Sequence, residues 1–511
     1  MSTRPAAGAL CVILLSALPL AAQPDPADLS DLPEQTTPEW LSDTITRPHA
    51  NVATSALPPE ITVMPLGAVE IEAIGLLPPA ITGLPRDLWG ASETDTLSRL
   101  LGAQPVQGLP AIQAFTETLA LAELDPPADA DPDRAALFLA RLDLLLARGA
   151  LDPAQALIER ASPRNPDVFR RWFDISLLNG YAERACAAMA ANPDIAPTLP
   201  ARIFCLARSG DWSAAALTLD TGEALGRITE EEGDLIARFL DPELSDGAAP
   251  LPPDPALTPL TFQMRSAIGE RPATTGLPLA FAHADLSDLA GWRAQLDAAE
   301  RLTRSGAIEP AQWLAIYTSR VPSASGGVWD RVAALQRFDG AILAGDTSGT
   351  AARLPAAWEA MEGAGLEIAF AEIYADHLLR LPLTGEAGLL ARRIALLSSR
   401  YEQVAQAAVP QSEDERFAFA IATGQTATAP PAADMVANAV ADAFGPTPPE
   451  HRYAWFLQNN RLGEALLRAA LVLSNPGRDP ADLTDALALY RAVGLETVAR
   501  RAALQLILMR G

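Results

Sequence analysis

The 511-residue sequence contains no lysine, because all 38 of its basic residues are arginines. This absence excludes a P-loop, a Schiff-base enzyme and a Ser–Lys dyad, each of which needs a lysine side chain. The sequence has 63 acidic residues, which gives a formal net charge of −25. Since such a chain repels phosphate groups, we expect no binding to nucleic acid or to anionic lipid.

The sequence also has few residues that perform catalysis or bind metals. Its four histidines lie far apart and form no HExxH motif, and no GxSxG motif is present. Asp129, Asp131 and Asp133 imitate the first ligands of a calcium loop, but Arg134 and Ala140 stand where that loop needs Gly and Glu. We therefore expect no cofactor, no metal and no catalytic residue. The four histidines are His49, His283, His377 and His451.

Long apolar runs are missing apart from one near the N-terminus. Arg4 precedes an apolar run from Ala9 to Ala21, which is short for a membrane span and has the layout of a secretory signal. We predict that residues 1–22 are a signal peptide and that the mature chain has no stable membrane insertion. An alanine-rich composition whose basic residues are all arginine is typical of GC-rich bacteria. Export by such a bacterium places the mature chain in the periplasm, which is the compartment we predict. A retained anchor and a lipid on Cys11 are the alternatives.

Only two cysteines remain after such a cleavage, Cys186 and Cys205. Each lies in an Ala-rich helical stretch, and a Pro-rich turn centred on residues 192–200 separates the two stretches. An antiparallel helix pair would bring the two thiols face to face, so we predict a disulfide in an oxidising compartment. The alternative is a pair of small buried thiols.

Residues 23–132 are expected to form a Pro-rich acidic arm. Sixteen of the 44 prolines lie between residues 24 and 132, and proline at this density breaks helices and is excluded from central strands. The β-branched alternation over Ile61–Leu77 predicts at most one or two short strands, and short helices are expected around Thr94–Leu101 and Ala111–Leu124. We interpret the arm as a partly disordered spacer.

The remaining sequence is predicted to be helical. Arg134, Arg141 and Arg148 recur every seven residues in an otherwise apolar segment. This recurrence keeps them on one narrow helix face, so neighbouring helices must cover the other faces. The predicted segments are a helical repeat segment at 133–240, a Pro-rich linker at 241–259, a helical segment at 260–425, a loop at 426–434 and a C-terminal helical repeat segment at 435–511.

Glycine recurs at a regular spacing between helical stretches. Gly149, Gly180 and Gly210 lie 31 and 30 residues apart, and Gly463 and Gly494 are again 31 apart. A glycine between two helices fits the left-handed residue that ends the first helix. A period near 31 residues holds two short helices and their turns, so the predicted fold class is mainly α, an α-solenoid of antiparallel helix pairs.

Local motifs also mark helix starts after these glycines. The strongest internal match aligns GALDPAQAL from Gly149 with GAIEPAQWL from Gly306. Both copies combine a glycine stop with an acidic residue and a proline suited to the first helical turn. Thr229 and Glu232 form a capping-box pattern that opens another helix.

The repeat pattern resembles the tetratricopeptide class, with Gly–aromatic turns at Gly180-Tyr181 and Gly210-Asp211-Trp212. The resemblance covers residues 134–240 and 455–511, although the period is shorter than the 34 residues of that class. It implies a concave surface that holds a peptide or a partner domain. We therefore expect a periplasmic scaffold that binds an envelope protein, with an acidic groove that favours Arg- or Lys-bearing partners. One specific form of this hypothesis is a flagellar-motor accessory.

The helical body is also similar in texture to the superhelical part of the soluble lytic transglycosylases, which are exported. Those enzymes carry a lysozyme-like domain with a catalytic Glu followed by Ser. The sequence has no Glu-Ser dipeptide, and its helical pattern continues to Gly511. A peptidoglycan-active enzyme is therefore the alternative function.

Overall fold

Helices form nearly all of the regular structure in the computed structural model, which describes residues 38, 40–41, 70–131, 134–161, 165–425, 434–445, 452–475 and 479–509. Several helices begin where the sequence supplies a cap or a proline. The Thr229 side chain accepts a hydrogen bond from the Glu232 backbone N–H and completes the predicted capping box. Pro310 opens its helix at the first position, where no N–H is needed.

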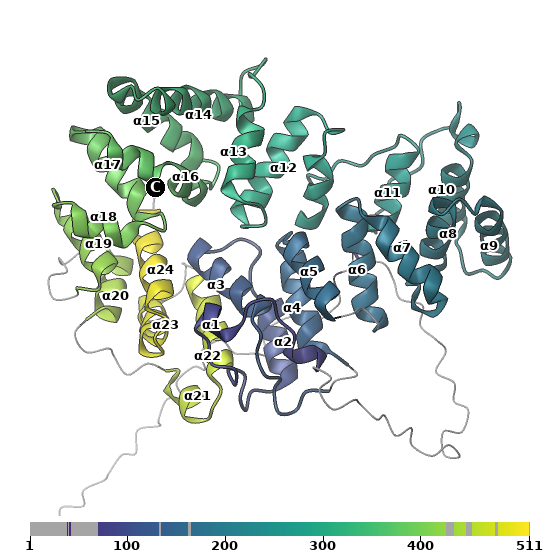
Figure 1. Ribbon diagram of the computed structural model, residues 1–511, viewed down its shortest axis with the longest axis horizontal. Helices are drawn as coiled ribbons and strands as arrows, with labels where there is room; N and C mark the ends of the chain where they lie inside the picture. The colour runs from purple at the N-terminus through teal and green to yellow at the C-terminus, as the bar shows by residue number, and fades with distance from the viewer. Residues whose placement is uncertain are drawn as a thin grey trace, which may run out of the picture.

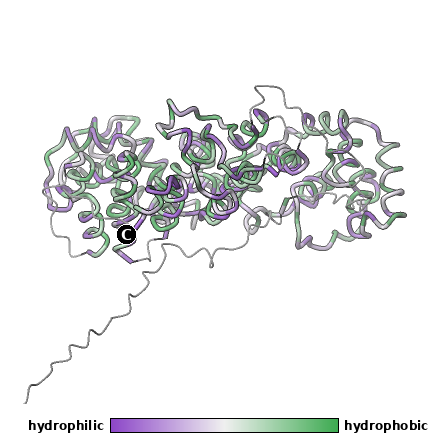
Figure 2. The backbone as a smooth tube through the Cα atoms, turned by 90° about the horizontal axis from the view of Figure 1, so that it is seen from below, coloured by the Kyte–Doolittle hydropathy of each residue, from purple (hydrophilic) through white to green (hydrophobic). Residues whose placement is uncertain are grey.

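The helices stack in pairs as an α-solenoid, which divides into two parts (Figure 1). We call residues 70–161 together with 279–509 the ring, and residues 166–267 the lobe. Seen from below, the lobe lies at one end of an elongated body (Figure 2). The first helices of the ring are η3 (Ile71–Ala73), α1 (Pro79–Thr82), α2 (Thr94–Gly102), α3 (Pro110–Leu121), α4 (Ala136–Ala147) and α5 (Leu151–Ala161).

The lobe follows in the sequence, and its first and last helices lie side by side. Its first helix, α6, packs against its last helix, α11, and the Gln263 side chain of α11 donates a 2.8 Å hydrogen bond to the Leu177 carbonyl of α6. The lobe comprises α6 (Pro166–Leu178), α7 (Ala182–Ala191), η4 (Pro193–Ile195), α8 (Leu199–Arg208), α9 (Trp212–Ala224), α10 (Glu230–Leu240), η5 (Pro242–Ser245) and α11 (Pro259–Ala267).

The chain then re-enters the ring through η6 (Leu279–Leu286), which packs against α4, α6 and α12. The remaining helices complete the circuit. They are α12 (Trp292–Arg304), α13 (Pro310–Thr318), α14 (Val328–Leu343), α15 (Thr347–Glu362), α16 (Glu367–Arg380), α17 (Gly385–Leu396), α18 (Tyr401–Ala407), α19 (Glu413–Thr423), α20 (Met435–Ala443), α21 (Ala454–Gln458), α22 (Leu462–Leu473), α23 (Pro480–Ala492) and α24 (Glu496–Leu508).

The ring closes because the C-terminal helices pack against α2 and α3. The Gln505 side chain of α24 accepts a 2.8 Å hydrogen bond from the Ala111 N–H in the first turn of α3, a donor that has no partner within its own helix. The ring of Phe115 on α3 meets Tyr490 on α23 edge-on, with the centroids 5.1 Å apart. Segments almost 400 residues apart in sequence thus share one hydrophobic core.

The arm contributes to this core instead of standing apart from it. Residues 94–102 and 110–121 form α2 and α3, near the positions that the sequence predicts, and both helices bury their apolar faces between α4 and α22. Residues 61–69 of the expected strand region lie outside the described residues, whereas residues 71–73 are helical. Leu77 pairs with Ala122 in an isolated parallel bridge, and the described residues contain no strand.

Two of the three recurring arginines are buried under the arm. Arg141 and Arg148 are only 1% and 2% exposed. The Arg141 guanidinium donates hydrogen bonds to the carbonyls of Ala120 and Ala122 at 2.8 and 2.9 Å, and its other η nitrogen donates to the Glu72 carbonyl. Burial lowers the pKa of Arg141 and of Arg148 to about 10, although nearby carboxylates oppose the shift. The arm therefore packs on the side of α4 that carries Arg141 and on Arg148, the C-cap residue of this helix.

The first turn of α4 also receives its cap from the arm. Ala135 precedes this helix and supplies no side-chain cap. Instead the Glu72 carboxylate accepts hydrogen bonds from the N–H groups of Leu137 and Phe138, at 3.2 and 2.7 Å. A carboxylate is favourable at this end of a helix because the helix dipole is positive there.

Five of the six predicted turn glycines occupy the left-handed region, with φ between +74° and +87°: Gly149, Gly180, Gly210, Gly306 and Gly494. The prediction was wrong for Gly463, which lies inside the first turn of α22. A Cβ at Gly463 would stand 2.4 Å from the Trp89 ring, so this glycine permits the arm to approach α22 closely. The left-handed residue of that turn is Asn460, with φ of 55°.

Candidate functional site

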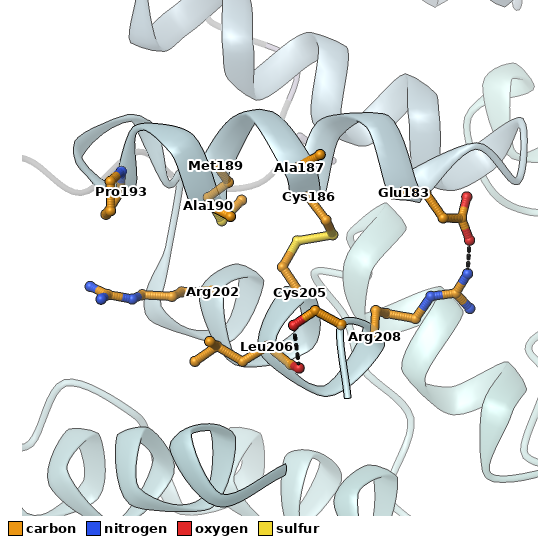
Figure 3. A pocket seen from close by; sticks show the side chains of 11 residues that line it. Glu183, Cys186, Ala187, Met189, Ala190, Pro193, Arg202, Cys205, Leu206 and Arg208 are labelled. Carbon is orange, nitrogen blue, oxygen red and sulfur yellow. Dashed lines mark hydrogen bonds and ion pairs between the residues drawn. A yellow bond between two sulfur atoms is a disulfide. The ribbon is translucent and has the colours of Figure 1, made fainter. Parts of the chain in front are cut away.

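The lobe carries a groove beside the predicted disulfide. Cys186 on α7 and Cys205 on α8 form a disulfide with their Cα atoms 5.1 Å apart. The groove runs over this bridge and measures about 380 Å³. Apolar side chains line its centre, mainly Ala187, Met189 and Ala190 of α7 (Figure 3).

The two ends of the groove differ in charge. At one end Glu183 and Arg208 form an ion pair that joins α7 to α8 (Figure 3). At the other end lie Pro193 and Arg202. Arg202 is exposed and forms no ion pair within the part of the chain that the structure describes. The groove therefore presents an unpaired positive charge beside an apolar floor.

This outcome differs from the acidic groove expected from the overall charge. Two arginines and one glutamate line the groove. The sequence does place Arg202 and Arg208 on either side of Cys205, but only the tertiary structure brings α7 against them. Net charge describes the whole molecule and gives no information about one surface.

Two exposed aromatic side chains stand at the turns next to the groove. Tyr181 is 58% exposed and Trp212 is 52% exposed. Tyr181 lies two residues before Glu183, and Trp212 lies three residues after Ser209, and both Glu183 and Ser209 line the groove. Large exposed aromatics beside an apolar groove are typical of interaction surfaces. We call Tyr181, Trp212 and the groove the lobe surface.

The first repeat turn has the same backbone but a different environment. The turn at Gly149 is covered by η6: His283 makes a 2.6 Å hydrogen bond to the Gly149 carbonyl, and Leu279 packs beside this glycine. Burial lowers the pKa of His283, although this hydrogen bond opposes the shift. The turns at Gly180 and Gly210 have nothing within 4 Å of where a Cβ would stand.

Residues that the sequence singled out for possible chemistry have structural roles or stay apart. Asp129 accepts hydrogen bonds from the N–H and the hydroxyl of Thr94 and thereby caps α2. His283 lies on η6 and His377 on α16, while His49, His451 and Asp133 lie outside the described residues. Across the ranges that the structure describes, no group of three His, Cys, Asp or Glu side chains could hold a metal ion.

No protein-family model, no curated protein and no solved structure matches this chain. Among the described helices, none combines the length and the apolar character that crossing a bilayer requires. The signal peptide predicted at residues 1–22 lies outside the described residues.

Proposed function

We propose that this protein is an exported periplasmic scaffold whose lobe surface binds a protein partner of the cell envelope. The observation that supports this proposal is the pair of exposed aromatic side chains at the two lobe turns next to the groove. The chain covers its first turn with η6 and leaves the turns at Gly180, Gly210, Gly306 and Gly494 open. At the two lobe turns, Tyr181 and Trp212 are exposed close in sequence to residues that line the apolar groove. An exposed aromatic pair of this kind supplies the residue types that dominate binding energy at protein interfaces.

The intramolecular contact suggests the form of the partner. η6 is a short 3-10 segment that lies across a repeat turn and places Leu279 against it. A partner segment of similar shape would place apolar side chains in the groove over the disulfide. A carboxylate on that segment would meet Arg202, whose guanidinium is suited to bidentate binding. The proposed partner therefore presents a short apolar segment that carries an acidic residue.

The compartment belongs to the same proposal. The N-terminal pattern predicts export, and the Cys186–Cys205 disulfide is compatible with an oxidising compartment. A flagellar-motor accessory remains one specific form of this scaffold, and the identity of the partner would decide it.

The proposal is tested by site-specific photo-crosslinking in living cells. A photoreactive residue is placed at Tyr181 or, in a matched control, at Trp455, which is 55% exposed on α21 in the ring. We expect a discrete crosslinked envelope protein from position 181 and none of the same mass from position 455. The captured partner is then purified and titrated against Tyr181→Ala, Trp212→Ala and Trp455→Ala variants.

Each lobe variant should weaken binding of that partner about tenfold or more, which corresponds to about 1.4 kcal/mol. The Trp455→Ala variant should bind like the unaltered protein. Equal crosslinking from both positions, or equal affinity of all three variants, would contradict the proposal. Turnover of peptidoglycan fragments by the purified protein would instead favour the cell-wall enzyme.

A further inference from the structure

A second cavity lies at the centre of the ring, away from the lobe surface. It measures about 200 Å³ and is lined by α3, by the turn between α12 and α13, by the turn between α15 and α16, and by α24. Four separate parts of the ring thus converge on one small space, which exists only because the ring closes. The cavity is smaller than the pockets that hold drug-sized ligands, so it suits a small molecule.

Charges of both signs face this cavity without forming ion pairs. Glu117 on α3, Glu309 before α13 and Arg304 at the end of α12 all line it. None of the three forms an ion pair within the described residues, although the structure holds many such pairs elsewhere. Two carboxylates and one guanidinium therefore remain available to a ligand.

A buried hydroxyl group also lacks a partner there. Thr303 lines the cavity and is only 9% exposed, yet its Oγ1 atom makes no hydrogen bond in the described structure. Arg501, which also lines the cavity, pairs with Glu372 at 3.4 Å but leaves its Nε atom without a partner. Both atoms are buried by the protein, so neither is exposed to the cavity.

We propose that the ring cavity binds a small zwitterion with an apolar side chain, an α-amino acid or a dipeptide. The ligand carboxylate meets Arg304, since a guanidinium binds a carboxylate through parallel hydrogen bonds. The ligand ammonium lies between Glu117 and Glu309. Ala114, Ile308 and Leu366 line the same cavity and leave room for a small apolar side chain.

The electrostatics of Glu117 add a pH dependence. Burial raises the pKa of Glu117, the Arg148 guanidinium opposes this shift, and the Glu309 carboxylate reinforces it. An ammonium group beside Glu117 would stabilise its ionised form. Arg304 and Arg501 are the other charged groups that line the cavity. We therefore expect zwitterion affinity to fall as the pH is lowered from neutral, because Glu117 takes up a proton.

The experiment is calorimetric titration of the full chain with L-alanine, D-alanine, L-alanyl-L-alanine and D-alanyl-D-alanine. At least one of these probes should bind. Removing one charge from the best probe, by N-acetylation or by amidation of its carboxylate, should weaken binding about tenfold or more. The inference is overturned if none of the four probes binds at millimolar concentration, or if the blocked forms bind as tightly as the zwitterion.

Variants distinguish the cavity from other surfaces. Glu117→Gln and Arg304→Gln should each weaken the best probe about tenfold, and Glu117→Gln should also remove the pH dependence. The matched controls are Glu386→Gln and Arg320→Gln, which change exposed side chains that do not line the cavity. Circular dichroism establishes that each variant is folded. Equal binding by cavity variants and controls would overturn the assignment, and partner capture through Tyr181 is measured independently of it.

Discussion

The first turn of the ring and the two turns of the lobe share one backbone conformation but differ in their surroundings. In the ring, the Gly149 turn is packed against Leu279 and Leu302 and bonded to His283. In the lobe, the Gly180 and Gly210 turns are open, as are the Gly306 and Gly494 turns of the ring, and a disulfide crosslinks the helices between the two lobe turns. The ring is held by contacts between distant segments, whereas the lobe is held mainly by contacts between successive helices. The turn of a solenoid unit can therefore either pack against another segment of the chain or remain exposed to solvent.

The largest expected effect comes from removing the arginine that anchors the arm to the ring. Arg141→Ala leaves three buried carbonyls without donors and should lower the free energy of unfolding by about 3–5 kcal/mol. Arg134→Ala, in the turn before α4 and not on the helix face that the sequence predicts, changes an exposed side chain and should cost less than about 0.5 kcal/mol. Chemical denaturation of both variants measures the difference. Similar costs would mean that the arm does not stabilise the ring.

Removing the disulfide should affect the lobe and spare the ring. For a crosslink of 19 residues, chain entropy predicts a loss of about 3 kcal/mol in the Cys186→Ala/Cys205→Ala variant. Hydrogen exchange measured by mass spectrometry should increase in α7 and α8 but not in α3 or α22. An equal increase in ring and lobe would show that the two parts unfold as one unit.

The two kinds of turn can be compared directly by adding one methyl group to each. Gly210→Ala meets no neighbouring atom, so it should cost only the left-handed backbone penalty of about 1–2 kcal/mol. At Gly149 the new Cβ would stand 2.9 Å from Leu302 and 3.2 Å from Leu279, so overpacking adds about 1–3 kcal/mol. Thermal unfolding of the two variants gives the comparison. Equal losses would contradict the close packing of η6 on the first turn.

The smallest expected effect is the pH response of the covered turn. Because burial lowers the pKa of His283 below 6.5, the unfolded chain binds this proton more tightly than the folded chain. The contribution of His283 to stability is therefore complete above about pH 6.5 and is lost as the pH falls through the lowered pKa. Denaturation of the unaltered protein and of a His283→Gln variant at neutral and mildly acidic pH isolates this contribution. A variant with the same pH response would exclude His283 as its source.

Local signals in the sequence predicted much of the helical architecture. The capping box at Thr229, the proline at Pro310 and the glycines at Gly180 and Gly210 act on neighbouring residues, so their effect is visible from spacing alone. Gly463 shows the limit of this reasoning. Its spacing imitates a helix stop, but its role is to admit Trp89 from a segment more than 370 residues away.

The two candidate sites could be predicted to different degrees. The cysteines and the Gly–aromatic turns of the lobe surface can be predicted from the sequence because they lie within about 30 residues of one another. The ring cavity was missed, since Glu117, Arg304 and Arg501 share no motif and come from three distant helices. Among 63 acidic residues, nothing in the sequence distinguishes Glu117 from a solvated one.

The amino-acid sequence by itself determined the helices, most of their ends and the repeat period, because capping, proline geometry and apolar periodicity act over one or two turns of the chain. Only the tertiary structure decided that the arm seats on buried arginines and that one turn is covered while its equivalents stay open. It also decided that four segments enclose a charged cavity. These outcomes depend on which distant surfaces pack together, and burial then fixes the partners and the pKa of each charged group.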